Sequence, residues 1–158
     1  LANAADLRRQ LAHAGVQLSA LDAHSTLLLP QVGVPYRYGG SNPTQGFDCS
    51  GLVSYVFTQQ GIVVPRTAAQ QFAAASSVSE SDLRPGDLVF FRLEPRKSTI
   101  THVGIYTGQR RFVHAPQTGR DVSEASLDDP WYRERFAGSG RFYDARKDGA
   151  GPRLKASP

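Results

Sequence analysis

Apolar residues recur at helical spacing directly after the only cysteine of the 158-residue chain. The positions i, i+1, i+4 and i+5 form one stripe of a helix, and they are occupied by Leu52, Val53, Val56 and Phe57. Asp48 precedes this stripe and is a strong N-cap residue, because its carboxylate can accept a hydrogen bond from a free N–H of the first turn. Gly61 fits the left-handed position that follows many helix ends. The pattern therefore predicts a helix with Cys49 in its first turn.

The second half of the chain carries short apolar runs bounded by turn residues, which are typical of strands. They cover residues 87–91, 101–107, 111–114 and 140–143. Weaker helical patterns cover residues 25–32, 67–72 (with Thr67 as the cap) and 128–136. The small or charged residues at 73–81 and 92–98 predict loops. The predicted order is thus a helix that bears the cysteine, followed by strands.

Two histidines are symmetric about the turn expected at Gly108. His102 lies six residues before Gly108, and His114 lies six residues after it. If the hairpin is centred there, the two side chains are near-opposite on neighbouring antiparallel strands, on one face and about 5 Å apart. A turn centred elsewhere would shift the pairing by one residue and weaken the argument. The alternative is a pair of half-buried strand histidines with no chemical role.

The position of Cys49 at a helix start matters for its chemistry. The thiolate is the reactive form of cysteine, and a helix N-terminus is expected to lower the thiol pKa. A cysteine that only fills the core would more naturally fall on the apolar stripe, although a lone cysteine is often just a small buried hydrophobe. A thiol beside a base, with a third group that orients the base, is the arrangement of nucleophilic catalysis. We therefore favour a reactive thiol served by His102 and His114.

Composition and charge limit the classes of protein and of binding partner that fit this chain. With 40% hydrophobic and 20% charged residues, its composition is that of one globular domain. No apolar run approaches the ~20 residues of a membrane span. The chain has no methionine, so we expect that processing or truncation removed the natural start, together with any signal peptide or lipid anchor. The net charge of +4 suits an anionic partner, but no basic run interleaves with aromatic residues as in nucleic-acid grooves.

Five segments, in this order, carry a resemblance to a known family. They are Pro35-Tyr36-Arg37-Tyr38-Gly39-Gly40, Phe47-Asp48-Cys49-Ser50-Gly51-Leu52-Val53, Leu83-Arg84-Pro85-Gly86-Asp87-Leu88-Val89-Phe90-Phe91, His102-Val103-Gly104-Ile105-Tyr106 and Phe112-Val113-His114-Ala115. Together they resemble the NlpC-type family of papain-like cysteine peptidases, over roughly residues 26–143. The resemblance implies a papain-like α+β fold, in which an N-terminal helix bearing the nucleophile packs on an antiparallel sheet.

The implied activity is that of a peptidoglycan endopeptidase. It would hydrolyse an amide bond in the stem peptides or cross-links, next to D-Glu or diaminopimelate, in the periplasm, at the envelope or outside the cell. We expect a monomer that needs no cofactor or metal and has peptidoglycan stem peptides, not nucleic acid, as its partner. By domain, residues 1–24 form an N-terminal extension with some helical pattern, residues 25–146 the NlpC-like domain, and residues 147–158 a disordered tail.

The resemblance also implies a role for each site residue. Cys49 would be the nucleophile, His102 the general base and His114 the residue that orients His102. Tyr36 would help the Cys49 N–H to stabilise the oxyanion. The substrate-binding candidates are Asp48, Ser50 and Arg66, although Asp48 serves equally well as a plain helix cap.

Three other functions remain open on the sequence. A zinc-dependent amidase could use Cys49, His102 and His114 as ligands with water in the fourth position, although no closely spaced ligand pair supports it. A thiol acyltransferase on the same scaffold would pass the thioester to an acceptor other than water. A non-catalytic cell-wall-binding module would not need the intact set of one cysteine and two histidines.

Overall fold

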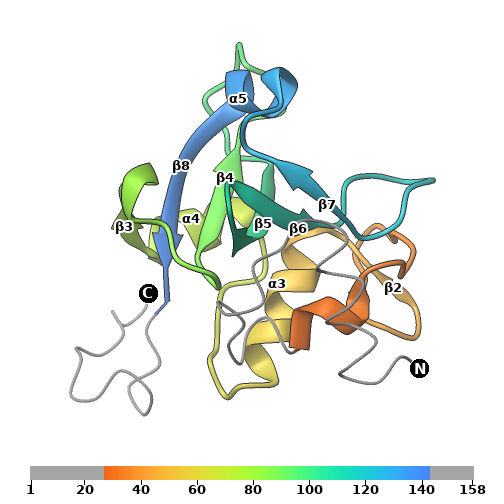
Figure 1. The fold of residues 1–158 in the computed structure, drawn as a ribbon. Helices are drawn as coiled ribbons and strands as arrows, with labels where there is room; N and C mark the ends of the chain where they lie inside the picture. The colour runs from red at the N-terminus through yellow and green to blue at the C-terminus, as the bar shows by residue number, and fades with distance from the viewer. Residues whose placement is uncertain (1–26, 143–158) are drawn as a thin grey trace.

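The computed structural model describes residues 27–142, in which helices pack on an antiparallel sheet (Figure 1). In chain order the elements are η2 (Leu29–Gln31), β1 (Ser41–Asn42), β2 (Gly46–Phe47), α3 (Cys49–Thr58), α4 (Ala68–Ala74), β3 (Ser76–Val78), η3 (Glu80–Asp82), β4 (Leu88–Phe91), β5 (His102–Gly108), β6 (Arg111–His114), β7 (Ser123–Ser126), α5 (Pro130–Arg135) and β8 (Phe136–Arg141). The predicted α+β class, with the cysteine helix packed on an antiparallel sheet, is confirmed. Within these residues, no helix is long and apolar enough to cross a membrane.

The main sheet has six strands in the order β3-β8-β4-β5-β6-β7, and every neighbouring pair is antiparallel. Its two central strands are the most buried, because every residue of β4 and β5 is inaccessible or nearly inaccessible to solvent. Strands β1 and β2 form a separate two-stranded sheet that leads directly into α3. The sheet therefore gives the cysteine helix a rigid, buried surface to rest on.

Helix α3 starts where the capping pattern predicts. Asp48 is the N-cap and its Oδ1 accepts a hydrogen bond from the Gly51 N–H at 2.7 Å. The apolar stripe of the helix packs on side chains of β4, β5 and β6 in the larger core cluster. From the sheet this cluster receives Leu88, Phe90, Val103, Ile105 and Val113. Burial of the stripe thus fixes the first turn of α3, and Cys49 with it, over the start of β5.

The opposite face of the sheet has its own, smaller core. It is built from Val89, Phe91, Tyr106, Phe112 and Leu127. His102 and His114 lie on this face, because side chains alternate along a strand and Val103 and Val113 belong to the other cluster. Ring contacts confirm the placement, since His102 lies 5.9 Å from Phe91 and His114 lies 4.9 Å from Phe112 between ring centroids.

The hairpin between β5 and β6 differs in register from the symmetric turn expected at Gly108. Ile105 pairs with Val113 and Gly108 with Arg111, with an irregularity between them. Continuing this register places Gly104, not His102, opposite His114. The two histidines are therefore diagonal neighbours rather than directly opposed. The offset is two residues, so they remain on one face, because the side-chain period of a strand is two.

Other expected elements are partly wrong. The loop expected at residues 73–81 is instead the end of α4 followed by β3 and η3. The last strand begins at Phe136, inside the segment expected to be helical, and ends at Arg141. At residues 25–32, Leu27 and Leu28 are helical and η2 follows them. The extension 1–24 and the tail 147–158 lie outside the described residues.

Candidate active site

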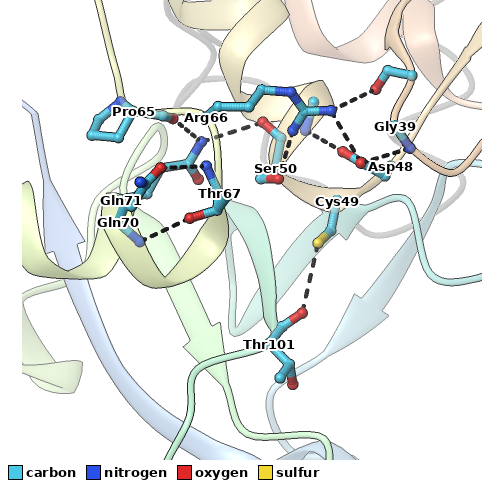
Figure 2. A network of polar contacts seen from close by, with 12 residues as sticks. Gly39, Asp48, Cys49, Ser50, Pro65, Arg66, Thr67, Gln70, Gln71 and Thr101 are labelled. Atoms are coloured by element: carbon cyan, nitrogen blue, oxygen red, sulfur yellow. Dashed lines mark hydrogen bonds and ion pairs between the residues drawn. The ribbon is translucent and has the colours of Figure 1, made fainter.

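Cys49 lies at the N-terminus of α3 and faces the strand that begins with His102. Its Sγ is 3.9 Å from the carbonyl oxygen of Thr101, the residue that precedes His102 (Figure 2). Among residues 27–142, no direct hydrogen bond joins the Cys49 thiol to His102. Catalytic hydrogen bonds are often long in a free enzyme and shorten only when substrate binds. The structure thus brings the thiol to the backbone beside His102.

Burial raises the pKa of the Cys49 thiol above its ordinary value. The Val103 N–H and the N–H groups of Ser50 and Cys49 act in the opposite direction, since they donate toward the sulfur and stabilise a thiolate. The expectation of a lowered pKa is therefore not met: desolvation outweighs the helix N-terminus. The resting sulfur is a thiol, and it needs a base to become a nucleophile.

His102 and His114 form one buried unit. His102 Nε2 and His114 Nδ1 are 2.7 Å apart, and both side chains are nearly inaccessible to solvent. One of these two nitrogens must carry the shared proton. If His102 Nε2 donates, His102 Nδ1 keeps a free lone pair and can act as a base. This hydrogen bond therefore couples the tautomer of His102 to its neighbour.

Both histidines are held neutral in the folded protein. Burial lowers the pKa of His102 to about 4. The pKa of His114 is also lowered, first by burial and then by the nearby His102 and Arg120. Neutral imidazole is the form that can accept a proton, so both rings start in the base form.

Arg66 joins the two residues that flank Cys49. Its Nη1 donates to Ser50 Oγ at 2.8 Å, and its Nη2 donates to Asp48 Oδ2 at 3.0 Å (Figure 2). The Gly39 N–H also donates to Asp48 Oδ2, at 3.0 Å. The three predicted substrate-binding residues thus form one cluster. Within it, Asp48 is committed to the helix cap and to the loop before it, and Ser50 lines the pocket beside the thiol, whereas Arg66 is linked to Cys49 through these two neighbours.

A close approach between the chain before α3 and the helix requires glycine at position 51. A Cβ on Gly51 would overlap the carbonyl oxygen of Gly40, and it would also lie 2.8 Å from Asp48 Oδ1. Gly40 itself accepts from the Asp48 N–H at 3.0 Å. Glycine at position 51 therefore lets the loop that carries Tyr36 fold tightly over the nucleophile.

A pocket of about 280 Å³, here called the Cys49 pocket, opens beside the thiol. It is lined by Tyr36, Tyr38, Asp48, Cys49, Ser50 and Thr101, among others. Burial raises the pKa of Tyr36, and so do the nearby Cys49 and Asp48, so its phenol stays protonated and can donate a hydrogen bond. The structure thus brings Tyr36 into the same pocket as Cys49.

A second pocket, of about 320 Å³ and here called the His102 pocket, lies on the histidine side. Its lining includes Leu93, His102, Arg120, Asp129, Trp131 and Tyr132. Thr101 lines the Cys49 pocket and His102 lines this one, so the two pockets flank one short piece of backbone. A molecule that reaches both Cys49 and His102 can therefore extend into a pocket on either side.

The profile of the NlpC/P60 family matches residues 33–141, which include all seven predicted site residues. The chain belongs to the NlpC/P60 family. This places it among cysteine peptidases, in agreement with the resemblance seen in the sequence motifs.

Individual NlpC/P60 relatives agree with the profile. The chain is similar to murein DD-endopeptidase MepH of Escherichia coli, at 42% identity over 117 residues that cover 72% of this chain and 43% of the relative. It is also similar to the gamma-DL-glutamyl hydrolase of Bacillus subtilis, at 44% identity over 112 residues, with 70% of this chain and 27% of the relative covered. The chain therefore spans less than half the length of these two curated relatives.

Comparison with solved structures supports the same family assignment. An NlpC/P60 protein from Bacillus cereus superposes with a TM-score of 0.72 at 32% identity, and the match covers 76% of this chain and 39% of the other. The sheet and cysteine helix described above are thus the NlpC/P60 fold.

The NlpC/P60 motifs in the sequence do not include the residues that line the His102 pocket beyond His102 itself. Arg120, Asp129, Trp131 and Tyr132 lie in the loop after β6 and around the start of α5, outside the five motif segments. The only available signal was the single tryptophan of the chain, close to a run of charged residues.

The ligand geometry also bears on the zinc alternative. Within residues 27–142, no three His, Cys, Asp or Glu side chains gather closely enough to hold a metal ion. Cys49, His102 and His114 are therefore not arranged around one point.

Proposed function

We propose that this NlpC/P60 domain hydrolyses an amide bond in the stem peptides of bacterial peptidoglycan, next to D-Glu or diaminopimelate, with Cys49 as the nucleophile. One observation carries the proposal: a thiol at a helix N-terminus and a buried histidine pair meet at Thr101–His102, with a pocket on each side. The relatives named above as a murein DD-endopeptidase and a gamma-DL-glutamyl hydrolase support the substrate class.

The first half-reaction begins from a neutral thiol and a neutral imidazole. His102 Nδ1 takes the thiol proton as the sulfur attacks the scissile carbonyl, and a carbon–sulfur bond forms. The Cys49 N–H and the Tyr36 hydroxyl donate to the resulting oxyanion. The tetrahedral intermediate then collapses, the carbon–nitrogen bond breaks, and His102 passes its proton to the leaving amine. The products of this half are a free amine and a thioester on Cys49.

The second half-reaction returns the enzyme to its starting state. His102 takes a proton from water, and the oxygen attacks the thioester carbonyl. The carbon–sulfur bond breaks, the sulfur recovers the proton from His102, and a carboxylic acid leaves. His114 accepts the hydrogen bond from His102 Nε2 throughout, which keeps Nδ1 free to move protons. All steps use groups of this chain and water.

Ser50 and Arg66 are proposed to contact polar groups of the acyl part of the substrate. Ser50 lines the Cys49 pocket, and Arg66 Nη1 donates to Ser50 Oγ. Asp48 contributes through the cap and through its ion pair with Arg66 at 3.0 Å. Because peptidoglycan lies outside the cytoplasm, we place the protein in the periplasm, at the envelope or outside the cell. We retain residues 25–146 as the extent of the domain and a monomer as its state.

Replacing the nucleophile tests the proposal. Cys49→Ala is expected to abolish release of soluble fragments from purified peptidoglycan while leaving the circular dichroism spectrum unchanged. Thr58→Ala, an exposed change at the other end of α3, serves as the matched control and should release fragments at the wild-type rate. Fragments are identified by mass spectrometry, which also reads out the bond that is cut. Release of fragments by Cys49→Ala would refute the thiol mechanism.

Thiol and metal chemistry are separated by two reagents. Iodoacetamide should inactivate the wild-type enzyme by alkylating Cys49, which is the only cysteine of the chain. A chelator such as EDTA should leave the rate unchanged. Loss of activity on chelation, restored by added zinc, would instead favour a zinc-dependent amidase.

A further inference from the structure

The His102 pocket has a defined place in the reaction, provided that the proposed function holds. His102 gives its proton to the leaving amine, so the amine side of the scissile bond must extend past His102. The pocket that His102 lines is therefore the one that receives the amine side. The acyl side, which stays on the sulfur, then lies in the Cys49 pocket.

The His102 pocket contains one charge of each sign, and neither is neutralised by an ion pair with another described residue. Arg120 makes no side-chain ion pair there, and only its backbone is bonded, to Gln117 and Tyr36. Asp129 Oδ1 accepts from the Trp131 N–H at 2.9 Å, but its carboxylate meets no cation within ion-pair distance. Burial raises the pKa of the Tyr132 phenol; the nearby Asp129 raises it further, and Arg120 acts in the opposite direction. The two charges therefore flank the same ring.

Aromatic side chains form a fixed wall of the pocket. Trp131 keeps 47% of its surface exposed, although the Arg135 guanidinium stacks 4.0 Å from its ring centroid. Tyr132 packs edge-on against both Trp131 and His114, with centroid distances of 4.9 and 5.4 Å. A partly exposed tryptophan that lines a pocket offers a flat apolar surface to a ligand.

We propose that the His102 pocket binds a zwitterionic amino-acid head group on the amine side of the substrate. Its carboxylate pairs with Arg120, its ammonium pairs with Asp129, and the methylene chain behind the head lies on Trp131. A ligand with only a carboxylate would meet Asp129 unfavourably, and a ligand with only an ammonium would meet Arg120 unfavourably. A head that carries both charges satisfies both residues.

The chemistry of the stem peptide supplies such a head. Diaminopimelate has two amino-acid centres: one lies in the peptide chain, and the other carries a free ammonium and carboxylate when its amine is not cross-linked. A diaminopimelate residue that is not cross-linked, on the amine side of the scissile bond, therefore fits the His102 pocket. In a cross-link, the second amine is itself acylated, and the head is no longer a zwitterion.

Binding can be measured without turnover because Trp131 is the only tryptophan of the chain. Its fluorescence is titrated in the Cys49→Ala variant with three probes: diaminopimelate, cadaverine, which lacks both carboxylates, and pimelate, which lacks both ammonium groups. A saturable change is expected with diaminopimelate at an affinity at least about tenfold above that of the other two, as is typical for one lost charge-assisted contact. Equal responses to all three probes would overturn the proposal.

Two variants test separately what the charges of Arg120 and Asp129 contribute to binding. Arg120→Gln should reduce diaminopimelate affinity at least about tenfold by removing the carboxylate partner. Asp129→Asn should have a similar effect on the ammonium, and asparagine preserves the cap of α5 because it is also a good N-cap residue. Arg133→Gln is the matched control: it removes an arginine of α5 that does not line the pocket, and it should bind diaminopimelate as before. An unchanged affinity in Arg120→Gln would overturn the proposal.

Hydrolysis of stem peptides gives a second, independent test of the head-group site. The wild type is assayed on stem peptides with diaminopimelate or lysine in the third position, since lysine keeps the ammonium and lacks the carboxylate. A higher kcat/KM on the diaminopimelate peptide is expected, and Arg120→Gln should erase this preference by lowering kcat/KM on the diaminopimelate peptide. On the lysine peptide kcat/KM should rise, because the variant lacks the guanidinium that opposes the lysine ammonium. A preference that survives in Arg120→Gln would refute the head-group site and leave the proposed function standing. If Cys49→Ala cleaved the peptides, the proposed function would fail, while the Trp131 titration would still decide whether the pocket takes a zwitterion.

Discussion

At the residue scale, the hydrogen bond between His102 and His114 joins two rings with unequal tasks. In the proposed mechanism His102 must move a proton in each half-reaction, so only an ionisable group can serve there. His114 has only to hold the tautomer and plane of the His102 ring, which an amide can also do. The bond of 2.7 Å between Nε2 and Nδ1 supplies that constraint directly.

This asymmetry predicts a graded series of variants. His102→Gln should lose ~10²–10⁴ in kcat/KM or more. His114→Ala should be strongly impaired, whereas His114→Gln or His114→Asn should keep a measurable part of the activity. All four are assayed on one stem peptide at one pH. If His114→Gln were as inactive as His102→Gln and His114→Ala were no worse, the orienting role would be wrong. If His102→Gln were the mildest, the roles would be exchanged.

The lowered pKa values of the two histidines predict how stability depends on pH. In the unfolded chain each histidine takes up a proton near pH 6.5, but in the folded protein His102 does so only near pH 4. Between these values the unfolded state binds more protons, so the free energy of unfolding falls as the pH falls below 6.5. The loss at pH 5 relative to pH 7.5 should be about 2 kcal/mol for each histidine.

Urea denaturation of the wild type and His114→Asn at both pH values checks this prediction. The variant should retain roughly half of the pH-dependent loss, because one of the two titrating rings is gone. An equal loss in both proteins would mean that His114 is not buried in its neutral form.

How far the sequence predicts the site depends on the residue. Cys49, His102 and His114 are identifiable because each lies in a pattern with a physical meaning: a helix start, and two strand positions of equal parity. The two-residue change of register leaves the prediction that both histidines share one face of the sheet correct, because it preserves that parity. The direction of the Cys49 pKa shift was not predictable, since desolvation depends on tertiary packing. Arg120 and Asp129 acquire a role only through the loops that bring them together.

At the scale of elements, α3 is the part that the sequence specifies best. The cap, the apolar stripe and the terminal glycine agree with one another, and the helix has the expected start. The outer strands are different. Strand β7 has the sequence Ser-Glu-Ala-Ser and is only partly buried, so it has no alternating apolar pattern to detect. It forms because the edge of β6 offers backbone partners.

Strand β8 shows a second reason for a missed element. Its glycines give a weak strand signal, yet Gly140 is needed because a Cβ there would lie 2.6 Å from the Ala75 Cβ and 3.3 Å from the Ser76 carbonyl oxygen. The segment that follows α4 packs against β8 at this point. Tertiary packing, rather than local preference, selects the residue.

The cap of α3 gives a test at this scale. Asp48→Ala removes both the bond from the Gly51 N–H and the ion pair with Arg66, and it should lower the free energy of unfolding by about 1–2 kcal/mol. Asp48→Asn keeps a cap oxygen for the Gly51 N–H but loses the partly exposed ion pair with Arg66 and the acceptor of the Gly39 N–H, so it should cost less than Asp48→Ala, about 1 kcal/mol. Urea denaturation of the two variants compares them. Equal destabilisation would show that the ion pair, rather than the cap, holds the start of the helix.

At the scale of the whole molecule, charge decides how the protein meets an extended anionic substrate. With peptidoglycan as the proposed substrate, the net charge of +4 is expected to attract the anionic cell wall over a distance set by salt. Release of fragments from intact peptidoglycan should therefore fall several-fold between ~50 mM and ~500 mM NaCl. Cleavage of a short stem peptide should change less, because most of its binding is local. Initial rates on the two substrates measure the difference, and equal salt sensitivity would argue against attraction by the whole surface.

The burial of Cys49 has a consequence for the lifetime of the enzyme. Oxidation by peroxide begins with the thiolate, and a thiol whose pKa is raised offers little thiolate at neutral pH. The chain has no second cysteine that could react with a sulfenic acid to form an internal disulfide. Slow formation of the sulfenic acid is therefore the main protection of Cys49 against irreversible oxidation. A hydrolase that works outside the reducing cytosol would thus keep its sulfur reduced between encounters with substrate.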